Sequence, residues 1–263
     1  MSVNYLGYLA AALYIAAATS ILLKQLNKTQ NVLTSFLSKI FIYLAVICHG
    51  TSLYFSANSK VGANFSLFNT ASIIALIITI IIMIGSRIKT VSTTALVAFP
   101  LSSIFIILSI NYPLESNFST DNIGIKIHIV LSLIAYSFFS VAIVQALFLF
   151  LTEYRLKTHR PIMNLLPPMR IIEELMFFST TVAFILLTLG LAVGSMFIED
   201  ILDQNLAHKI FFSLLAWIIF LALIIGRFKY RLRGKNAILL VIGGFVLLGT
   251  GFFGTKLVLE LIL

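Results

Sequence analysis

The chain has 263 residues, of which 60% are hydrophobic and only 10% are charged. An ordinary soluble domain is roughly 45–50% apolar, so this composition excludes a typical water-soluble enzyme. The net charge is +9, and in so apolar a chain this excess of Lys and Arg indicates membrane topology rather than nucleic-acid binding. The single cysteine, Cys48, cannot form an internal disulfide, and no Cys/His spacing typical of zinc is present.

Eight apolar runs are long enough to cross a bilayer, which needs about 20 residues per helix. They predict an all-α fold, a polytopic membrane helix bundle with about eight transmembrane helices. No Lys or Arg precedes Lys24, so we expect the first run to be a permanent helix rather than a signal peptide. The expected spans are 5–23, 35–55, 65–84, 91–110, 125–151, 176–198, 210–225 and 237–259.

Basic residues separate by loop parity, and cytoplasmic loops of membrane proteins retain Lys and Arg. The odd-numbered loops hold thirteen of them and the opposite side only four, which predicts that both termini face outward. Lys39, near the cytoplasmic end of the second span, is expected to extend its ammonium to the interface. The thirteen are Lys24, Lys28, Arg87, Lys89, Arg155, Lys157, Arg160, Arg170, Arg227, Lys229, Arg231, Arg233 and Lys235, and the four are Lys60, Lys126, Lys209 and Lys256.

No repeat or linker divides the chain, so we expect a single membrane domain over residues 1–263. The one long connection is a cytoplasmic loop at about 152–175, in which Pro167 and Pro168 interrupt any helix. Residues 169–178 are expected to lie in the interface as a short amphipathic segment. Gly190 and Gly194 are expected to permit close helix packing, and Pro100 to kink the fourth span.

Histidines are the candidate functional residues, because ionisable groups at membrane depth are costly. His49, His128 and His208 all fall toward the predicted outer ends of their spans, and imidazole is a good axial ligand for haem iron. Lys126 and Lys209 stand where haem propionates would emerge. The alternative for each histidine is an ordinary interfacial side chain bonded to water or lipid. His159 lies in the basic loop and is expected to be solvated.

Other chemistries have little support in the sequence. Every Asp and Glu falls outside the expected spans or at their ends, which argues against an ion-coupled carrier. No nucleophile elbow, zinc-protease or phosphate-loop motif occurs, so we expect no enzymatic activity. Polar residues within the spans are expected to form interhelical hydrogen bonds, with a polar transport path as the alternative.

Several segments together resemble a known family. The chain is similar to the CcsA/CcmC-type cytochrome c assembly integral membrane proteins, and most of all to their YpjD-like branch. The resemblance covers essentially the whole chain. The segments that carry it are ICHGTSLYF (47–55), NFSLFNTASII (64–74), IHIVLSLIAYS (127–137), LPPM (166–169), AHKIFFSLLAW (207–217), RLRGK (231–235) and FGTKLVLELIL (253–263).

The resemblance implies a haem-handling bundle of the bacterial inner membrane, in which His49 corresponds to an intramembrane histidine and His128 to one on the outer face. Partners would be cytochrome c assembly proteins or an apocytochrome. The Trp-rich haem motif of the synthase-type relatives is replaced by AHKIFFSLLAW, which retains Trp217 alone. A histidine expected late in the seventh helix is replaced around Gly226 and Arg227, and none occurs near the carboxyl end.

The sequence therefore predicts a membrane protein that binds or passes haem near the outer leaflet. His49 and His128 are the expected iron ligands, His208 is a third candidate, and Trp217, Lys126 and Lys209 are expected to help hold the cofactor. The alternative is a small transporter or membrane adaptor that kept the bundle and lost haem binding.

Overall fold

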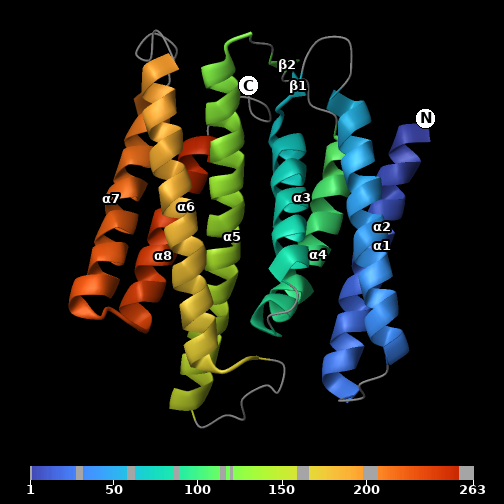
Figure 1. Ribbon diagram of the computed structural model, residues 1–263, viewed down its shortest axis with the longest axis horizontal. Coiled ribbons are helices and arrows are strands. Elements are labelled where there is room, and N and C mark those ends of the chain that lie inside the picture. Colours follow the sequence, from blue (N-terminus) through green and yellow to red (C-terminus); the bar gives the residue numbers. More distant parts are fainter. Residues whose placement is uncertain are drawn as a thin grey trace. The chain divides into compact units, whose positions relative to one another are not determined.

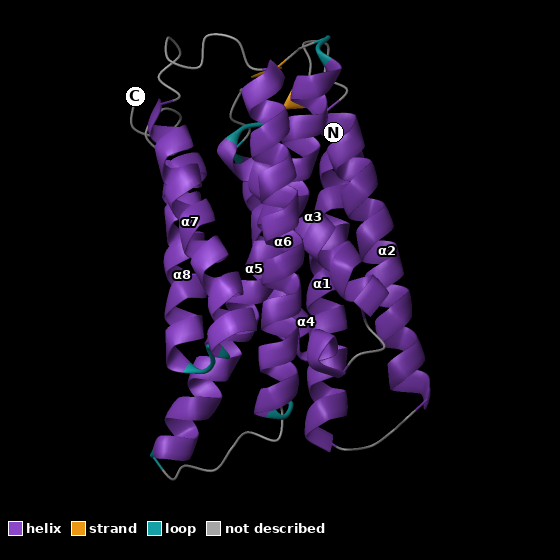
Figure 2. Cartoon of the chain, turned by 60° about the vertical axis from the view of Figure 1, so that its left-hand side comes forward, coloured by secondary structure: helices purple, strands orange, loops and turns teal. Residues whose placement is uncertain are grey.

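A computed structural model describes residues 2–27, 32–57, 63–85, 89–112, 117–118, 121–158, 166–197 and 207–254. Helices account for nearly all of them (Figure 2), and eight are long and apolar enough to cross a membrane. The predicted all-α membrane fold is confirmed. The helices are α1 (Ser2–Asn27), α2 (Val32–Ala57), α3 (Leu67–Gly85), α4 (Lys89–Asn111), α5 (Ile123–Lys157), α6 (Met169–Phe197), α7 (Ala207–Tyr230) and α8 (Lys235–Gly249), and α8 runs into a π-helical turn, η1 (Thr250–Gly254).

The described residues form two compact units. The first, Met1–Ser119 with Met163–Pro167, holds α1 to α4, and the second, Thr120–Ile162 with Pro168–Leu263, holds α5 to α8. A single domain over the whole chain stays a prediction, as does the placement of both termini outside.

In the first unit, α1 packs against α2 and α4, while α3 packs mainly against α4 (Figure 1). Small side chains line these contacts, and Ala10, Ala17, Ala45 and Ala98 are all buried. Small residues let membrane helices approach closely, so van der Waals packing holds the unit together. Two short strands, β1 (Ala63–Asn64) and β2 (Asn117–Phe118), pair antiparallel between the helices.

In the second unit, α5 and α6 form the most extensive helix pair, and α7 and α8 form another (Figure 1). Its core contains the stacked rings of Phe139 and Phe220, whose centroids lie 4.1 Å apart. Both rings are buried.

Pro100, which was expected to kink the fourth span, lies inside α4 of the first unit, and the helix is continuous through it.

The predicted bounds of the fifth connection are wrong. Helix α5 continues to Lys157 and α6 begins at Met169, so the connection is 158–168 rather than about 152–175. Residues 169–178 form the first turns of α6, and their position in the membrane interface stays a prediction. The residues after the apolar run of α5, TEYRLK, include good helix formers, and Pro168 stands just before the first turn of α6, where its missing N–H costs nothing.

The longer helices also include two acids that were expected in the loop or at a span end. Glu153 lies in the last turns of α5 and Glu173 in the first turns of α6, so both are near a helix end, as predicted. Glu173 is buried and lies between two arginines, 3.6 Å from Nη1 of Arg227 and 3.2 Å from Nε of Arg233. The acid is therefore part of an ion-pair cluster at the end of the unit where α6 begins and α7 ends.

A pair of adjacent glycines in α8 gives a direct test of the packing in the second unit. A Cβ added at Gly244 would lie 2.6–2.9 Å from the buried ring of Phe220, whereas one added at Gly243 would meet nothing within 4 Å. We expect Gly244→Ala to lower the free energy of unfolding by about 1–3 kcal/mol, because the stacked ring cannot move aside freely. Gly243→Ala should be neutral or slightly stabilising. Unfolding in mixed detergent micelles measures both free energies. Equal stabilities of the two variants would contradict the close packing of Gly244 against Phe220.

Candidate functional site

His49 is fully buried in the first unit, where side chains from two other helices surround it. The Tyr14 hydroxyl of α1 lies 3.1 Å from its Nδ1, and the Ser72 hydroxyl of α3 lies 2.9 Å from its Nε2. The Tyr14 ring also meets the imidazole edge to face, with centroids 5.7 Å apart. Three helices therefore converge on this residue.

Both ring nitrogens of His49 have a hydroxyl partner. A neutral imidazole donates at one nitrogen and accepts at the other, and a hydroxyl can do either, so this arrangement satisfies the ring completely. Iron could bind Nε2 only after the Ser72 hydroxyl had moved away. The contacts therefore suit a polar tie between α1, α2 and α3, and they oppose ligation without rearrangement.

His128 is held differently, in the second unit. It lies on the second turn of α5, and its Nδ1 is 2.7 Å from the backbone carbonyl oxygen of Gly190 on α6. A carbonyl only accepts, so Nδ1 must carry the proton and donate. The nitrogen left with a lone pair is Nε2, and among the described residues it has no hydrogen-bond partner.

The α6 backbone makes room for this ring. A Cβ added at Gly194 would lie 2.7 Å from Nδ1 and 2.9 Å from Cε1 of His128, so only glycine fits there without displacement. A histidine whose second nitrogen is fixed by a carbonyl is the usual arrangement of a metal-binding imidazole. His128 thus has the tautomer and the ring restraint that an axial ligand needs.

The remaining predicted residues lie in the second unit. His208 and Lys126 are exposed, and Lys209 is half-buried at the start of α7. Trp217 donates from Nε1 to the Thr188 hydroxyl at 2.9 Å and stacks on Phe184, so it ties α7 to α6. Cys48 is partly buried next to His49, and His159 lies outside the described residues.

The sequence identified the histidines but missed their partners. Tyr14 and Ser72 lie on other helices, 35 and 23 residues from His49 along the chain. Nothing in a single sequence indicates such pairs. The close spacing of Gly190 and Gly194 in the sequence indicates only helix packing in general. Whether these glycines contact His128 depends on helix rotation, which the sequence does not determine.

A family comparison bears on these residues. The family described as "Cytochrome C assembly protein" matches the chain over residues 2–263. The chain belongs to this family. Membership gives it a general haem-related role in cytochrome c biogenesis, and the predicted family resemblance is confirmed.

The chain is also similar to individual proteins. The chain is 29% identical over 230 residues to the inner membrane protein YpjD of Escherichia coli K12, covering 83% of this chain and 85% of that protein. It is also 29% identical over 145 residues to an uncharacterized 28.8 kDa protein of Azospirillum brasilense, covering 54% of each chain. No solved structure matches significantly. The described residues include eight helices long and apolar enough to cross a membrane, and this family member is a multi-pass inner-membrane protein.

Proposed function

We propose that this cytochrome c assembly family member binds haem and passes it on, with His128 as an axial ligand. The observation that carries the proposal is the hydrogen bond from His128 Nδ1 to the Gly190 carbonyl, which leaves Nε2 available toward iron. Haem is here the cargo, and the chain acts as a binding protein rather than an enzyme.

The outer-leaflet position of the site rests on the distribution of charge. His128 is near the start of α5 and Gly190 near the end of α6, which is the side poor in Lys and Arg. Lys126, two residues before His128, and Lys209, at the start of α7, are the cations proposed to meet the propionates. His208 stays a candidate for the second axial position, Trp217 for a packing role beside the cofactor, and His49 for a ligand.

Spectroscopy tests the proposal directly. The protein is purified in mild detergent and titrated with haem while the Soret band is followed. We expect His128→Gly to lose or shift the band, and added imidazole to restore it, because imidazole can occupy the space left by the ring. His159→Gly is the matched control and should leave the spectrum unchanged.

Each outcome is informative. A wild-type spectrum in His128→Gly would reject His128 as the ligand. If the wild-type protein itself shows no Soret band, the haem proposal fails, and the transporter or adaptor alternative predicts solute uptake in proteoliposomes or a stable co-purifying protein.

The close contact between Gly194 and the His128 ring gives a second prediction. Gly194→Ala should weaken haem binding by about 10-fold or more, because its Cβ displaces the imidazole while the ligand itself remains. Gly190→Ala is the matched control, since its Cβ would approach only Ser132 and Leu131 at 3.6–3.8 Å and the carbonyl acceptor is kept. Haem titration of the two variants measures the difference in affinity. Equal affinities for haem would show that the contact with Gly194 does not position the His128 ring.

A further inference from the structure

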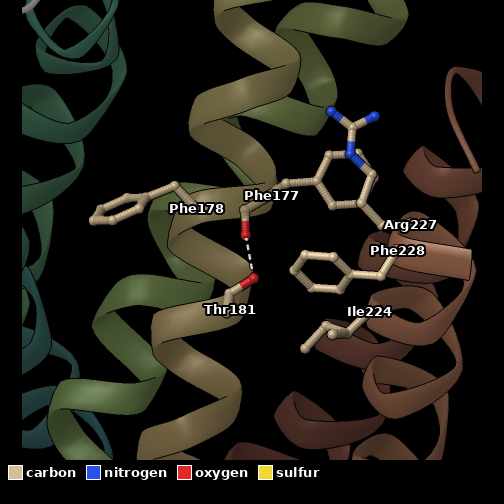
Figure 3. A pocket seen from close by; sticks show the side chains of 6 residues that line it. All are labelled: Phe177, Phe178, Thr181, Ile224, Arg227 and Phe228. Carbon is tan, nitrogen blue, oxygen red and sulfur yellow. Dashed lines mark hydrogen bonds between the residues drawn. The ribbon is translucent and has the colours of Figure 1, made fainter. Parts of the chain in front are cut away.

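A mostly apolar groove lies between α6 and α7, far along both helices from His128. It has a volume of about 260 Å³. Figure 3 shows Phe177 and Thr181 of α6 facing Ile224 and Phe228 of α7, while Phe178 extends along the other side of α6. Phe228 is 79% exposed on a helix that is long and apolar enough to cross a membrane, so the groove is open to the surroundings along α7.

Among the described residues, Arg227 is the charged one that lines this groove. Its guanidinium carbon lies 4.4 Å from the centre of the Phe177 ring, within the range of a cation–π contact. Its approach to Glu173 is 3.6 Å, too long for a good hydrogen bond. Among the described residues the guanidinium makes no hydrogen bond, so its N–H groups remain available to an anion.

The charge around Arg227 is positive overall. Glu173 is shared between Arg227 and Arg233, whereas Glu174 pairs with Arg170. The segment from Arg227 to Lys235, RFKYRLRGK, contains five cations and no acid. Glu153 is a third acid nearby, beside Gly234. The five cations of this segment still outnumber the three acids, and this surplus favours an anionic ligand.

We propose that this groove binds an anionic phospholipid, with an acyl chain along Phe177, Ile224 and Phe228 and the phosphate on Arg227. The apolar lining argues for a ligand with a hydrocarbon chain, because a free inorganic anion would gain nothing from it. Basic pockets between membrane helices on the positively charged side are suited to acidic head groups. The site is separate from the proposed haem site and does not depend on it.

Native mass spectrometry of the full-length protein tests this. The probe is phosphatidylglycerol, compared with phosphatidylcholine of identical acyl chains and with inorganic phosphate as competitor. We expect phosphatidylglycerol to bind more tightly than phosphatidylcholine, and Arg227→Gln to weaken it about fivefold. Lys229→Gln, which removes an exposed cation that does not line the groove, should weaken binding less than Arg227→Gln does.

A second variant covers the case in which Arg227→Gln disturbs the ion pairs and the fold. Phe228→Ala removes an exposed groove side chain and should weaken phosphatidylglycerol binding at least about threefold. Phe211→Ala, 61% exposed at the other end of α7, is its control. Equal binding of the two lipids, wild-type binding by Phe228→Ala, or displacement of the lipid by inorganic phosphate would each overturn the proposal.

Discussion

Replacing His49 by leucine is expected to lower the free energy of unfolding by about 2–4 kcal/mol. The change leaves the hydroxyls of Tyr14 and Ser72 without their imidazole partner in a fully buried position. Each unsatisfied buried hydroxyl costs about 1–3 kcal/mol, and the lower part of that range is appropriate where the unfolded state in the membrane finds other partners. Unfolding in mixed micelles with increasing dodecyl sulfate measures the loss.

Removing the two hydroxyls as well should rescue the stability of the His49 variant. In the triple variant His49→Leu, Tyr14→Phe, Ser72→Ala all three polar groups are removed together, so most of the lost stability should return. Cys48→Ala is the neighbouring control and should cost less than His49→Leu, since Cys48 is only partly buried. A triple variant no more stable than His49→Leu would show that cavity and shape effects, rather than unsatisfied hydroxyls, cause the loss.

This triple variant also separates two roles of His49. If it folds and keeps the wild-type Soret band, His49 acts as a polar tie between helices. If it folds and loses the band, His49 is an iron ligand and Ser72 must release Nε2 when haem binds. The sequence alone could not pose this question, because it gave the depth of His49 but not the neighbours of its two nitrogens.

The helices were predictable because bilayer thickness imposes a long apolar run on each of them. Their ends were less predictable, since polar helix formers continue a helix past its apolar run. Glu153 and Glu173 show the consequence: both seemed to lie in a loop or at an end, and both lie within helices. The burial of Glu173 depends on Arg227 and Arg233, which are more than 50 residues away in the chain.

The candidate site was predictable in its residue types and not in its geometry. Imidazoles at membrane depth are costly enough to single out His49 and His128. Helix rotation then gives the two residues opposite environments, one with both nitrogens engaged and one with Nε2 available. Rotation is set by packing contacts such as the Gly194 approach, so a hydropathy pattern cannot supply it.

The ion-pair cluster at the basic end of the second unit gives the other large expected effect. Replacing Arg227 and Arg233 together by leucine should lower the free energy of unfolding by about 3 kcal/mol, because the buried carboxylate of Glu173 loses both cations. Removing the partners of a buried charge typically costs about 3–5 kcal/mol, and the lower value fits a residue near a helix end. The same micelle unfolding measures it.

Two comparisons decide whether charge is the cause. Adding Glu173→Leu to the double variant should restore much of the stability, because an apolar set of similar volume often replaces a buried ion pair without loss. Arg170→Leu breaks a pair whose side chains are 81% and 52% exposed, so it should cost less than about 1 kcal/mol. If the double variant is as stable as the wild type, Glu173 does not depend on its arginines, and both are then free to serve an anionic lipid. If the triple variant stays as unstable as the double, the arginine stems stabilise this end of the unit through packing rather than charge.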